Sequence, residues 1–251
     1  MKSRNKKSLV AIINGTESSV IQNVLEQIPK EQRDLVRDVS MDMARNMALA
    51  IDKCFTKSTK TIDCFHVIKL VIEVVQHIRI KTRWEVLDSE NEAIKEAKSR
   101  GEKYTPVIFE NGDTERELLA RSRYLLFKYQ DQWTENQKLR ADILFRQFPT
   151  IEKAYTLSLI FRNIYKSKTK VKAEIKYSYW KDDVIKSEIE EFNTVMYSLE
   201  YHYDNIMNFF KNRSTNAYAE SFNSKIKNFR ANLKGVTDVK FFLFRLEKLF
   251  A

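Results

Sequence analysis

Glycine and proline are scarce in this chain. Four Gly and three Pro in 251 residues are too few for a fold with many turns, such as an all-β sandwich, so we expect long helices. Two cysteines provide no disulfide framework of the kind found in small secreted proteins, and they fit a reducing cytosol. No run approaches the ~20 apolar residues that span a bilayer, and residues 1–7 lead into no signal-like core. We therefore expect no membrane partner.

Acidic side chains are outnumbered. The 44 Lys and Arg residues against 34 Asp and Glu residues leave a formal charge of +10, with an isoelectric point near 9.4. A surplus of this size favours a polyanionic partner, and nucleic acid before an anionic membrane. The chain is also 43% apolar and 12% aromatic, which is enough to bury a core and excludes a disordered tail.

The first third of the chain alternates short apolar runs with helical patterns. Residues 9–13, 35–41 and 60–62 are the predicted strands, and a stripe of apolar residues at helical spacing follows each of them. Thr16 or Ser18 is predicted to cap the first helix. Because strands that alternate with helices pair in parallel, we expect an α/β fold with a buried parallel sheet.

Two aspartates stand where predicted strands end. Asp42 follows the second strand and Asp63 follows the third. In open α/β sheets, ligands collect beyond the carboxyl ends of the strands, which makes both acids candidates for a functional site. Aspartate is also a favoured N-cap of helices, and each of these residues precedes a helical pattern. Spacing alone leaves both interpretations open.

From Trp84 to Phe210 the strand signals stop and helical patterns take over. Residues 100–113 contain two glycines and a proline and are predicted to be a loop. Thr134 and Gln137 have the spacing of a capping box at the start of a helix that ends at residues 148–149. We therefore expect residues 84–210 to be an all-helical insertion.

Lysines are concentrated in residues 166–181. This stretch contains six of them and a single acid, Glu174, and a pair of aspartates follows it. Such a run is usually a solvated helix face. Interleaved aromatic residues would instead suit a surface that binds nucleic acid. Packing of these aromatic residues in the core is favoured over a role in binding nucleic acid. The aromatics concerned are Tyr177, Tyr179 and Trp180.

Glu220 is an isolated acid in a basic region. Between Lys211 and Lys234 there are six basic residues and one acid, which gives 6 − 1 = +5. The ordinary interpretation is a surface glutamate that makes helical ion pairs worth tenths of a kcal/mol. A buried stripe is predicted on this helix at Tyr218, Phe222, Ile226, Phe229 and Leu233, with N-cap candidates at Ser214, Thr215 and Asn216.

Three separated stretches carry a family resemblance. They read V-S-M-D-M-A-R-N-M from Val39, D-C-F-H-V-I-K from Asp63 and S-T-N-A-Y-A-E-S-F-N-S-K-I-K-N-F-R from Ser214. In this order they resemble the DDE transposases of bacterial insertion sequences, the ISL-three family. The likeness extends over residues 8–250, which is nearly the whole chain.

The resemblance implies a ribonuclease H-like core, incomplete at its N-terminus, with a large all-helical insertion. The expected domains are residues 1–83 for part of the core, 84–210 for the insertion, and 211–251 for the helices that complete the core. By resemblance, Asp42 is the second catalytic acid and Glu220 is the third. Asp63 and His66 correspond to an accessory pair beside the site.

The chemistry implied by the resemblance is cleavage of DNA and transfer of its strands, with Mg²⁺ or Mn²⁺ as cofactor and two ions in the complete enzyme. Asp42 and Glu220 are the implied metal ligands. The implied partners are insertion-sequence ends and target DNA, bound by a homo-oligomer in the bacterial cytoplasm at the nucleoid. The basic residues expected to hold phosphates are Lys225, Lys227, Arg230 and Lys234.

The family's first catalytic aspartate lies on a strand that precedes residues 9–13. No aspartate occurs here before Asp34, which belongs to a connection between a helix and a strand. We therefore expect this chain to be the C-terminal part of a transposase and to be inactive alone.

Two other classes of protein are alternatives. A non-catalytic helical protein that binds nucleic acid would explain the charge, but not the acids at strand ends. A structural zinc site would need closer pairs of ligands than this chain provides. Metal preference separates the three hypotheses, because the transposase needs Mg²⁺ or Mn²⁺, the zinc protein needs Zn²⁺ and the simple binder needs none. The zinc candidates are Cys54, Cys64, His66 and His77.

Overall fold

The computed structural model describes residues 10–213, 217–232 and 238–250. The chain divides into two compact units, which are described separately below. The sheet unit consists of residues 1–63 and 204–251, and the helical unit consists of residues 64–203. Within the described ranges, no helix is both long and apolar enough to cross a membrane.

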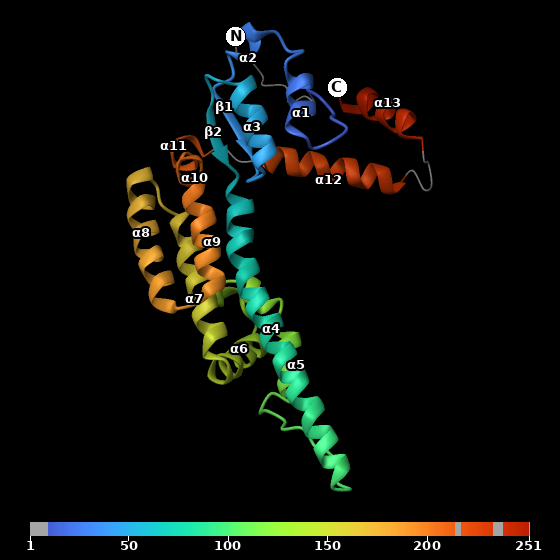
Figure 1. Ribbon diagram of the computed structural model, residues 1–251, viewed down its shortest axis with the longest axis vertical. Coiled ribbons are helices and arrows are strands. Elements are labelled where there is room, and N and C mark those ends of the chain that lie inside the picture. Colours follow the sequence, from blue (N-terminus) through green and yellow to red (C-terminus); the bar gives the residue numbers. More distant parts are fainter. Residues whose placement is uncertain (1–9, 214–216, 233–237, 251) are drawn as a thin grey trace. The chain divides into compact units, whose positions relative to one another are not determined.

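Two parallel strands form the sheet of the sheet unit (Figure 1). Strand β1 (Asp38–Met41) pairs with β2 (Thr59–Ile62) in a register that places Met41 opposite Ile62. Both of these side chains are buried, Met41 at 4% and Ile62 at 0% exposure. The structure confirms the second and third predicted strands and their parallel pairing.

Helix α3 (Arg45–Cys54) is the crossover that parallel pairing requires between β1 and β2. It packs against α1 (Ser18–Leu25) and buries Ile51 and Cys54. After the short helix α2 (Lys30–Arg33), the Nη1 atom of Arg33 donates to the carbonyl of Cys54 at 2.9 Å. This bond satisfies a carbonyl at the end of α3, where helices have unpaired acceptors.

The first predicted strand is wrong for the residues that the structure describes. Val10 to Ile13 form no strand, and the side chain of Val10 is 72% exposed. A strand needs a hydrogen-bonded neighbour, and among the described residues β1 pairs with β2 alone. The cap prediction is also wrong, because Glu17 is the N-cap of α1 and makes no side-chain bond.

The outer edge of β2 is covered by a residue far along the chain. Asn208 lies between α10 (Tyr203–Met207) and α11 (Phe209–Asn212), and its Nδ2 donates to the carbonyl of Lys60 at 2.9 Å. Thr59 donates its N–H toward β1, so the carbonyl of the next residue points to the opposite edge. The side chain of Asn208 therefore takes a position that a third strand would otherwise occupy.

Two helices end the described part of the sheet unit, α12 (Ala217–Asn232) and α13 (Val239–Phe250). The ring of Phe229 on α12 stacks on Phe242 of α13 with centroids 5.9 Å apart. Leu246 on α13 is buried. Aromatic stacking of this kind adds to the area that the two helices bury.

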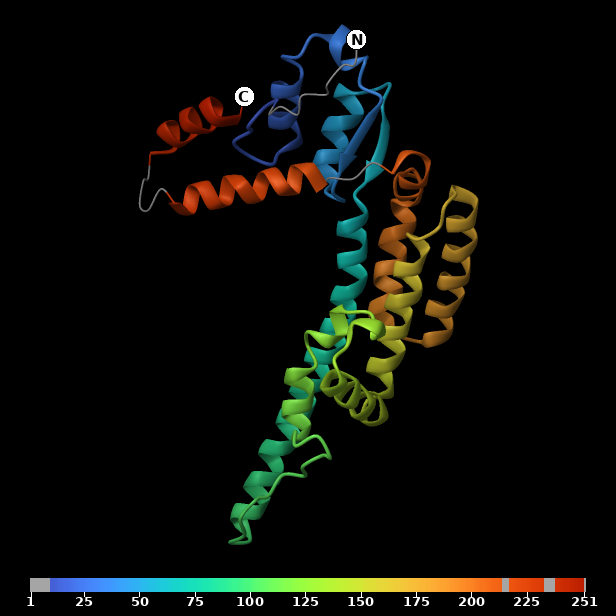
Figure 2. The same ribbon diagram turned by 180° about the vertical axis from the view of Figure 1, so that it is seen from behind.

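The helical unit is built around α4 (Cys64–Ser99), a single helix of 36 residues. Figures 1 and 2 show helices α7, α8 and α9 beside its first half. Helix α7 packs on α4, α6 and α8, and α9 packs on α4 and α8. The other elements are α5 (Glu115–Arg121), η1 (Leu125–Phe127), η2 (Gln130–Gln132), α6 (Glu135–Gln147), α7 (Pro149–Ile164), α8 (Lys170–Ser187) and α9 (Glu190–Tyr201).

Large aromatic residues fill the core of the helical unit. Trp180 is fully buried, and its Nε1 donates to the carbonyl of Leu157 at 3.1 Å. Tyr155 is equally buried and donates its hydroxyl to the carbonyl of Lys128 at 2.8 Å. The buried indole nitrogen of Trp180 and the buried hydroxyl of Tyr155 are thus both paired.

The predicted capping box at Thr134 and Gln137 is confirmed, with both reciprocal bonds present at the start of α6. A second capping box, between Thr114 and Glu117 at the start of α5, was not predicted. The mostly helical fold with a small parallel sheet is therefore established. The domain limits at residues 83 and 210 stay predictions, and so does the ribonuclease H-like core.

Candidate functional site

Asp42 follows the last residue of β1 and is half-buried. Its Oδ1 accepts the N–H of Ala44 at 2.9 Å. The N-cap of α3 is Ala44, which has no side-chain oxygen to offer. Asp42 is therefore not the N-cap of this helix but forms a turn with the residue two positions on.

This bond holds one carboxylate oxygen of Asp42 and leaves the other available. Within the described part of the chain, nothing donates to Oδ2. A carboxylate that is oriented by a backbone N–H and still presents an oxygen can accept a further hydrogen bond or coordinate a cation. Asp42 thus has the geometry of a binding residue at the end of a strand.

Asp63 is the neighbouring acid on the sheet. The register pairs Met41 with Ile62, so Asp42 and Asp63 are the next residues of two adjacent strands. Asp63 is only 1% exposed, its N–H donates to the carbonyl of Met41 at 2.9 Å, and it directly precedes α4. Of the two acids, Asp42 is therefore the one that solvent or a ligand can reach.

His66 belongs to the first turn of α4 in the helical unit. It is half-buried, and its ring meets the ring of Phe65 edge to face with centroids 6.0 Å apart. The accessory role of Asp63 and His66 stays a prediction.

Glu220 is the fourth residue of α12, so it lies in the first turn of that helix. Its side chain lies outside the described structure, as do the predicted N-caps Ser214, Thr215 and Asn216. Asp42 and Glu220 belong to the same compact unit. Their meeting in one site stays a prediction.

The basic residues of α12 that the structure describes are exposed. Lys225, Lys227 and Arg230 all face solvent, and none of them is ion-paired with a described acid. The guanidinium of Arg230 lies 5.5 Å from the centroid of the Phe242 ring. Lys234 lies outside the described residues. Exposed cations without counter-ions are suited to contacts with phosphate.

The aromatics of the lysine run mostly belong to the core, as predicted. Tyr177 and Trp180 are buried at 3% and 0% exposure, whereas Tyr179 is 65% exposed. Burial raises the pKa of the Tyr177 hydroxyl, and the nearby Glu200 carboxylate raises it further. Two of the three aromatic rings are therefore unavailable to stack on nucleic-acid bases.

A family model described as a transposase, that of the ISL-three DDE transposases, matches residues 1–246. The chain belongs to this transposase family. No curated protein and no solved structure matches it. Enzymes of this family cleave DNA and transfer its strands with divalent metal ions, so membership makes DNA the partner of this transposase.

The described side chains of the transposase do not form a complete metal site. Nowhere in residues 10–213, 221–232 or 238–249 do three or more His, Cys, Asp or Glu side chains gather as ligands. The four zinc candidates are among the residues searched. Asp42 does fit one ligand position, because its free oxygen is the hard donor that Mg²⁺ and Mn²⁺ prefer.

Sequence reasoning missed two residues that organise the transposase's sheet unit. Ala44 supplies the N–H that orients Asp42, and Asn208 covers the edge of β2. A backbone N–H leaves no signal in the residue type. Asn208 lies 148 residues from Lys60, so no local pattern could have linked them.

Proposed function

We propose that Asp42 and Glu220 are the second and third catalytic acids of this transposase. The observation that carries the proposal is the position of Asp42, directly after a parallel strand whose last residue, Met41, is buried, with one carboxylate oxygen unbonded. Ligands collect at such strand ends in α/β sheets. Glu220 follows on a basic helix after a helical unit, which is the order that the family resemblance implies.

In the proposed site, Asp42 and Glu220 would hold a divalent ion, and that ion would supply stabilisation of the negative charge on the scissile phosphate. The N–H of Ala44 fixes the orientation of the Asp42 carboxylate, so the ligand is positioned before DNA binds. Lys225, Lys227 and Arg230 hold the DNA backbone through their exposed cationic groups. The substrates are insertion-sequence ends and target DNA, and a homo-oligomer on DNA remains part of the proposal.

Residues 1–33 contain no aspartate and so offer no candidate for the family's first catalytic aspartate. Asp34 is engaged elsewhere, because its carboxylate pairs with Lys57 at 2.8 Å and this hydrogen bond lowers its pKa. We therefore propose that the polypeptide of 251 residues binds DNA without cleaving it.

Metal binding tests the pairing of Asp42 with Glu220 without relying on cleavage. Mn²⁺ affinity, measured by electron paramagnetic resonance with duplex DNA present, is compared among the parent, Asp42→Asn, Glu220→Gln and the double variant. If the two acids share an ion, each single change weakens binding, and the double variant loses much less than the sum of the two effects. Asp52→Asn is the matched control, because Asp52 is an acid of the same unit that pairs with Lys60.

Fully additive effects, or unchanged Mn²⁺ affinity in Asp42→Asn, would contradict the shared site. The second outcome would favour the alternative function, a non-catalytic helical protein that binds nucleic acid. The exposed basic face of α12 is the observation that supports this alternative.

A further inference from the structure

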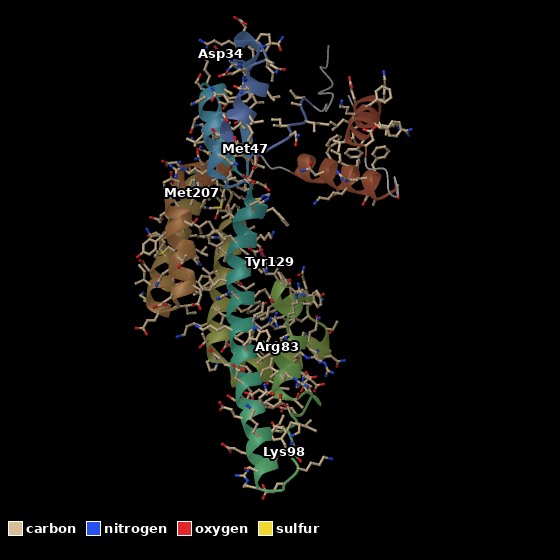
Figure 3. The ribbon with its side chains drawn as sticks, turned by 45° about the vertical axis from the view of Figure 1, so that its right-hand side comes forward. Asp34, Met47, Arg83, Lys98, Tyr129 and Met207 are labelled. Atoms are coloured by element: carbon tan, nitrogen blue, oxygen red, sulfur yellow. The ribbon has the colours of Figure 1, made fainter. Side chains whose placement is uncertain are left out.

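Tyr129, which is labelled in Figure 3, lies between η1 and η2 on the helical unit. Two cations stack on its ring. The guanidinium carbon of Arg162 is 3.7 Å from the ring centroid, and the ammonium of Lys166 is 4.5 Å from it. Lys128 is the adjacent residue in the chain. We call these four residues, Lys128, Tyr129, Arg162 and Lys166, the Tyr129 cluster.

The fold fixes the cluster in place. The buried hydroxyl of Tyr155 holds the carbonyl of Lys128, which sets the backbone beside Tyr129. Arg162 is in the last turn of α7, Lys166 follows two residues after that helix ends, and both side chains reach the ring of Tyr129. The Nη1 of Arg162 also donates to the carbonyl of Phe127 at 3.3 Å.

The Tyr129 cluster has no acidic counter-ion among the described side chains. None of its three cations pairs with a carboxylate. Elsewhere on the same unit, Arg140 and Arg146 pair with acids. The acid nearest along the chain is Asp131, which is exposed and makes no ion pair with a described residue.

The cluster continues into a basic stretch. Residues 162–176 contain six cations and one acid, which gives 6 − 1 = +5. The acid, Glu174, is already paired with Lys170 at 3.5 Å. Lys168 and Lys172 are exposed and have no described partner. Like charges gathered without counter-ions repel one another, so a bound anion would relieve an unfavourable arrangement.

A simpler explanation is that cations stabilise the carboxyl end of α7. It accounts for Lys176, whose Nζ donates to the carbonyl of Asn163 at 3.2 Å. It does not account for Lys168 and Lys172, which contact no described carbonyl or carboxylate. It also leaves most of the five N–H groups of Arg162 unused.

We propose that the Tyr129 cluster binds the phosphate backbone of duplex DNA. A guanidinium stacked on an aromatic face still presents N–H groups in its own plane, where they can meet a phosphate. The aromatic ring holds Arg162 and Lys166 in position, which lowers the entropy lost on binding. Contacts of this type carry no base recognition, so this surface retains any DNA sequence equally. The inference rests on DNA being the partner of this transposase.

The test uses the full chain and a fluorescein-labelled 30-base-pair duplex in EDTA, which prevents cleavage. Anisotropy gives the dissociation constant between 50 and 200 mM KCl for the parent and for Arg162→Gln/Lys166→Gln. Each phosphate contact contributes about 0.9 to the slope of log K against log salt. We expect the slope to decrease by about one to two units, so that between 50 and 200 mM KCl the affinity falls by a factor about 4 to 16 smaller than for the parent.

The matched control is Lys153→Gln/Lys186→Gln, which removes the same charge from two exposed lysines near the start of α7 and the end of α8. The control should keep the parent slope. If Arg162→Gln/Lys166→Gln lowers the melting temperature, the single variant Lys166→Glu, at an exposed position, is measured instead. We expect it to bind duplex DNA more weakly than the parent.

An unchanged slope in the cluster variants, or an equal change in the control, would overturn the proposal. So would a parent chain that binds no DNA at 50 mM KCl, or phosphatidylserine vesicles that compete as well as duplex DNA. A parent chain that binds no DNA would overturn the proposed function as well. An unchanged slope in the cluster variants, or an equal change in the control, overturns the Tyr129 proposal alone, because Mn²⁺ binding reports on Asp42 and Glu220 and not on the Tyr129 cluster.

Discussion

Asp113 offers the sharpest test of the packing of the helical unit. Its side chain is 1% exposed and pairs with Arg121 and with Arg140, the latter at 2.7 Å. Asn111 also donates to it at 2.8 Å. The bonds join the loop before α5 to α5 and α6. Replacing Asp113 by Asn keeps the shape but removes the charge that both arginines meet.

Removing one partner of a fully buried ion pair costs about 3–5 kcal/mol. Here the arginine side chains are partly hydrated, Arg121 at 51% and Arg140 at 22% exposure, so part of this cost is recovered from solvent. We expect Asp113→Asn to lower the free energy of unfolding by about 2–3 kcal/mol. For a chain of this length, the melting temperature should fall by about 5–10 °C.

The pH dependence provides a second measurement. Burial of Asp113 opposes its ionisation, but hydrogen bonds from Arg140 and Arg121 outweigh burial and lower its pKa. A carboxyl with a lowered pKa in the folded state stabilises fully above its unfolded pKa, about 3.9, and this stability is lost as the pH falls through the folded pKa. The free energy of unfolding of the parent should therefore exceed that of Asp113→Asn at neutral pH, and the difference should disappear only below about pH 4.

Urea unfolding followed by circular dichroism measures the difference in free energy of unfolding between the parent and Asp113→Asn, at pH 7 and at lower pH. Glu110→Gln is the control, because it neutralises an acid of the same loop that pairs with Arg146 at the exposed surface. The control should leave stability unchanged. A change of less than about 0.5 kcal/mol in Asp113→Asn would refute the reasoning, since that is the range of ordinary surface substitutions.

Three further predictions concern DNA and the sheet unit. The purified chain should bind duplex DNA at low salt but should not nick supercoiled plasmid with Mg²⁺. Robust cleavage that Asp42→Asn abolishes would contradict the proposal that this polypeptide cannot cleave DNA. Lys227→Ala/Arg230→Ala should weaken binding to all DNA sequences alike and lower the salt slope by about one to two units, and an unchanged slope would show that this face does not meet phosphate. Asn208→Ala should lower the free energy of unfolding by about 1 kcal/mol and speed hydrogen exchange in β2, because the carbonyl of Lys60 loses its donor; unchanged exchange would count against this role.

Local patterns were enough to predict β1, β2 and the capping box of Thr134 with Gln137. Each of these features depends on residues close together in the chain. The strand predicted at residues 9–13 failed for its described part, because pairing depends on a partner that periodicity cannot supply. The same limit hid the Tyr129 cluster, since Arg162 reaches Tyr129 from a different helix.

For Asp42, the sequence could predict the position in the fold but not the hydrogen bond that orients the side chain. Its place at a strand end could be read from the sequence, whereas its bond to Ala44 could not. An aspartate before a helix suits either a cap or a free ligand, and the difference is set by where the helix begins. Here α3 begins at Arg45, two residues later than a cap at Asp42 would require. The residue at which α3 begins thus decides whether the carboxylate of Asp42 caps the helix or can bind a ligand.

The bond from Asn208 to Lys60 also constrains the order in which the chain folds. It links residues 148 positions apart, and closing a flexible loop of that length costs about 4 kcal/mol in entropy. Several packed helix pairs of the helical unit, such as α7 with α8 and α4 with α5, are consecutive in sequence, which favours rapid folding. During synthesis, residues 64–203 emerge before Asn208 and can fold first, which shortens the effective loop. The edge of β2 at Lys60 stays uncovered until then, so we expect ribosome-bound chains that end before residue 208 to be prone to aggregation.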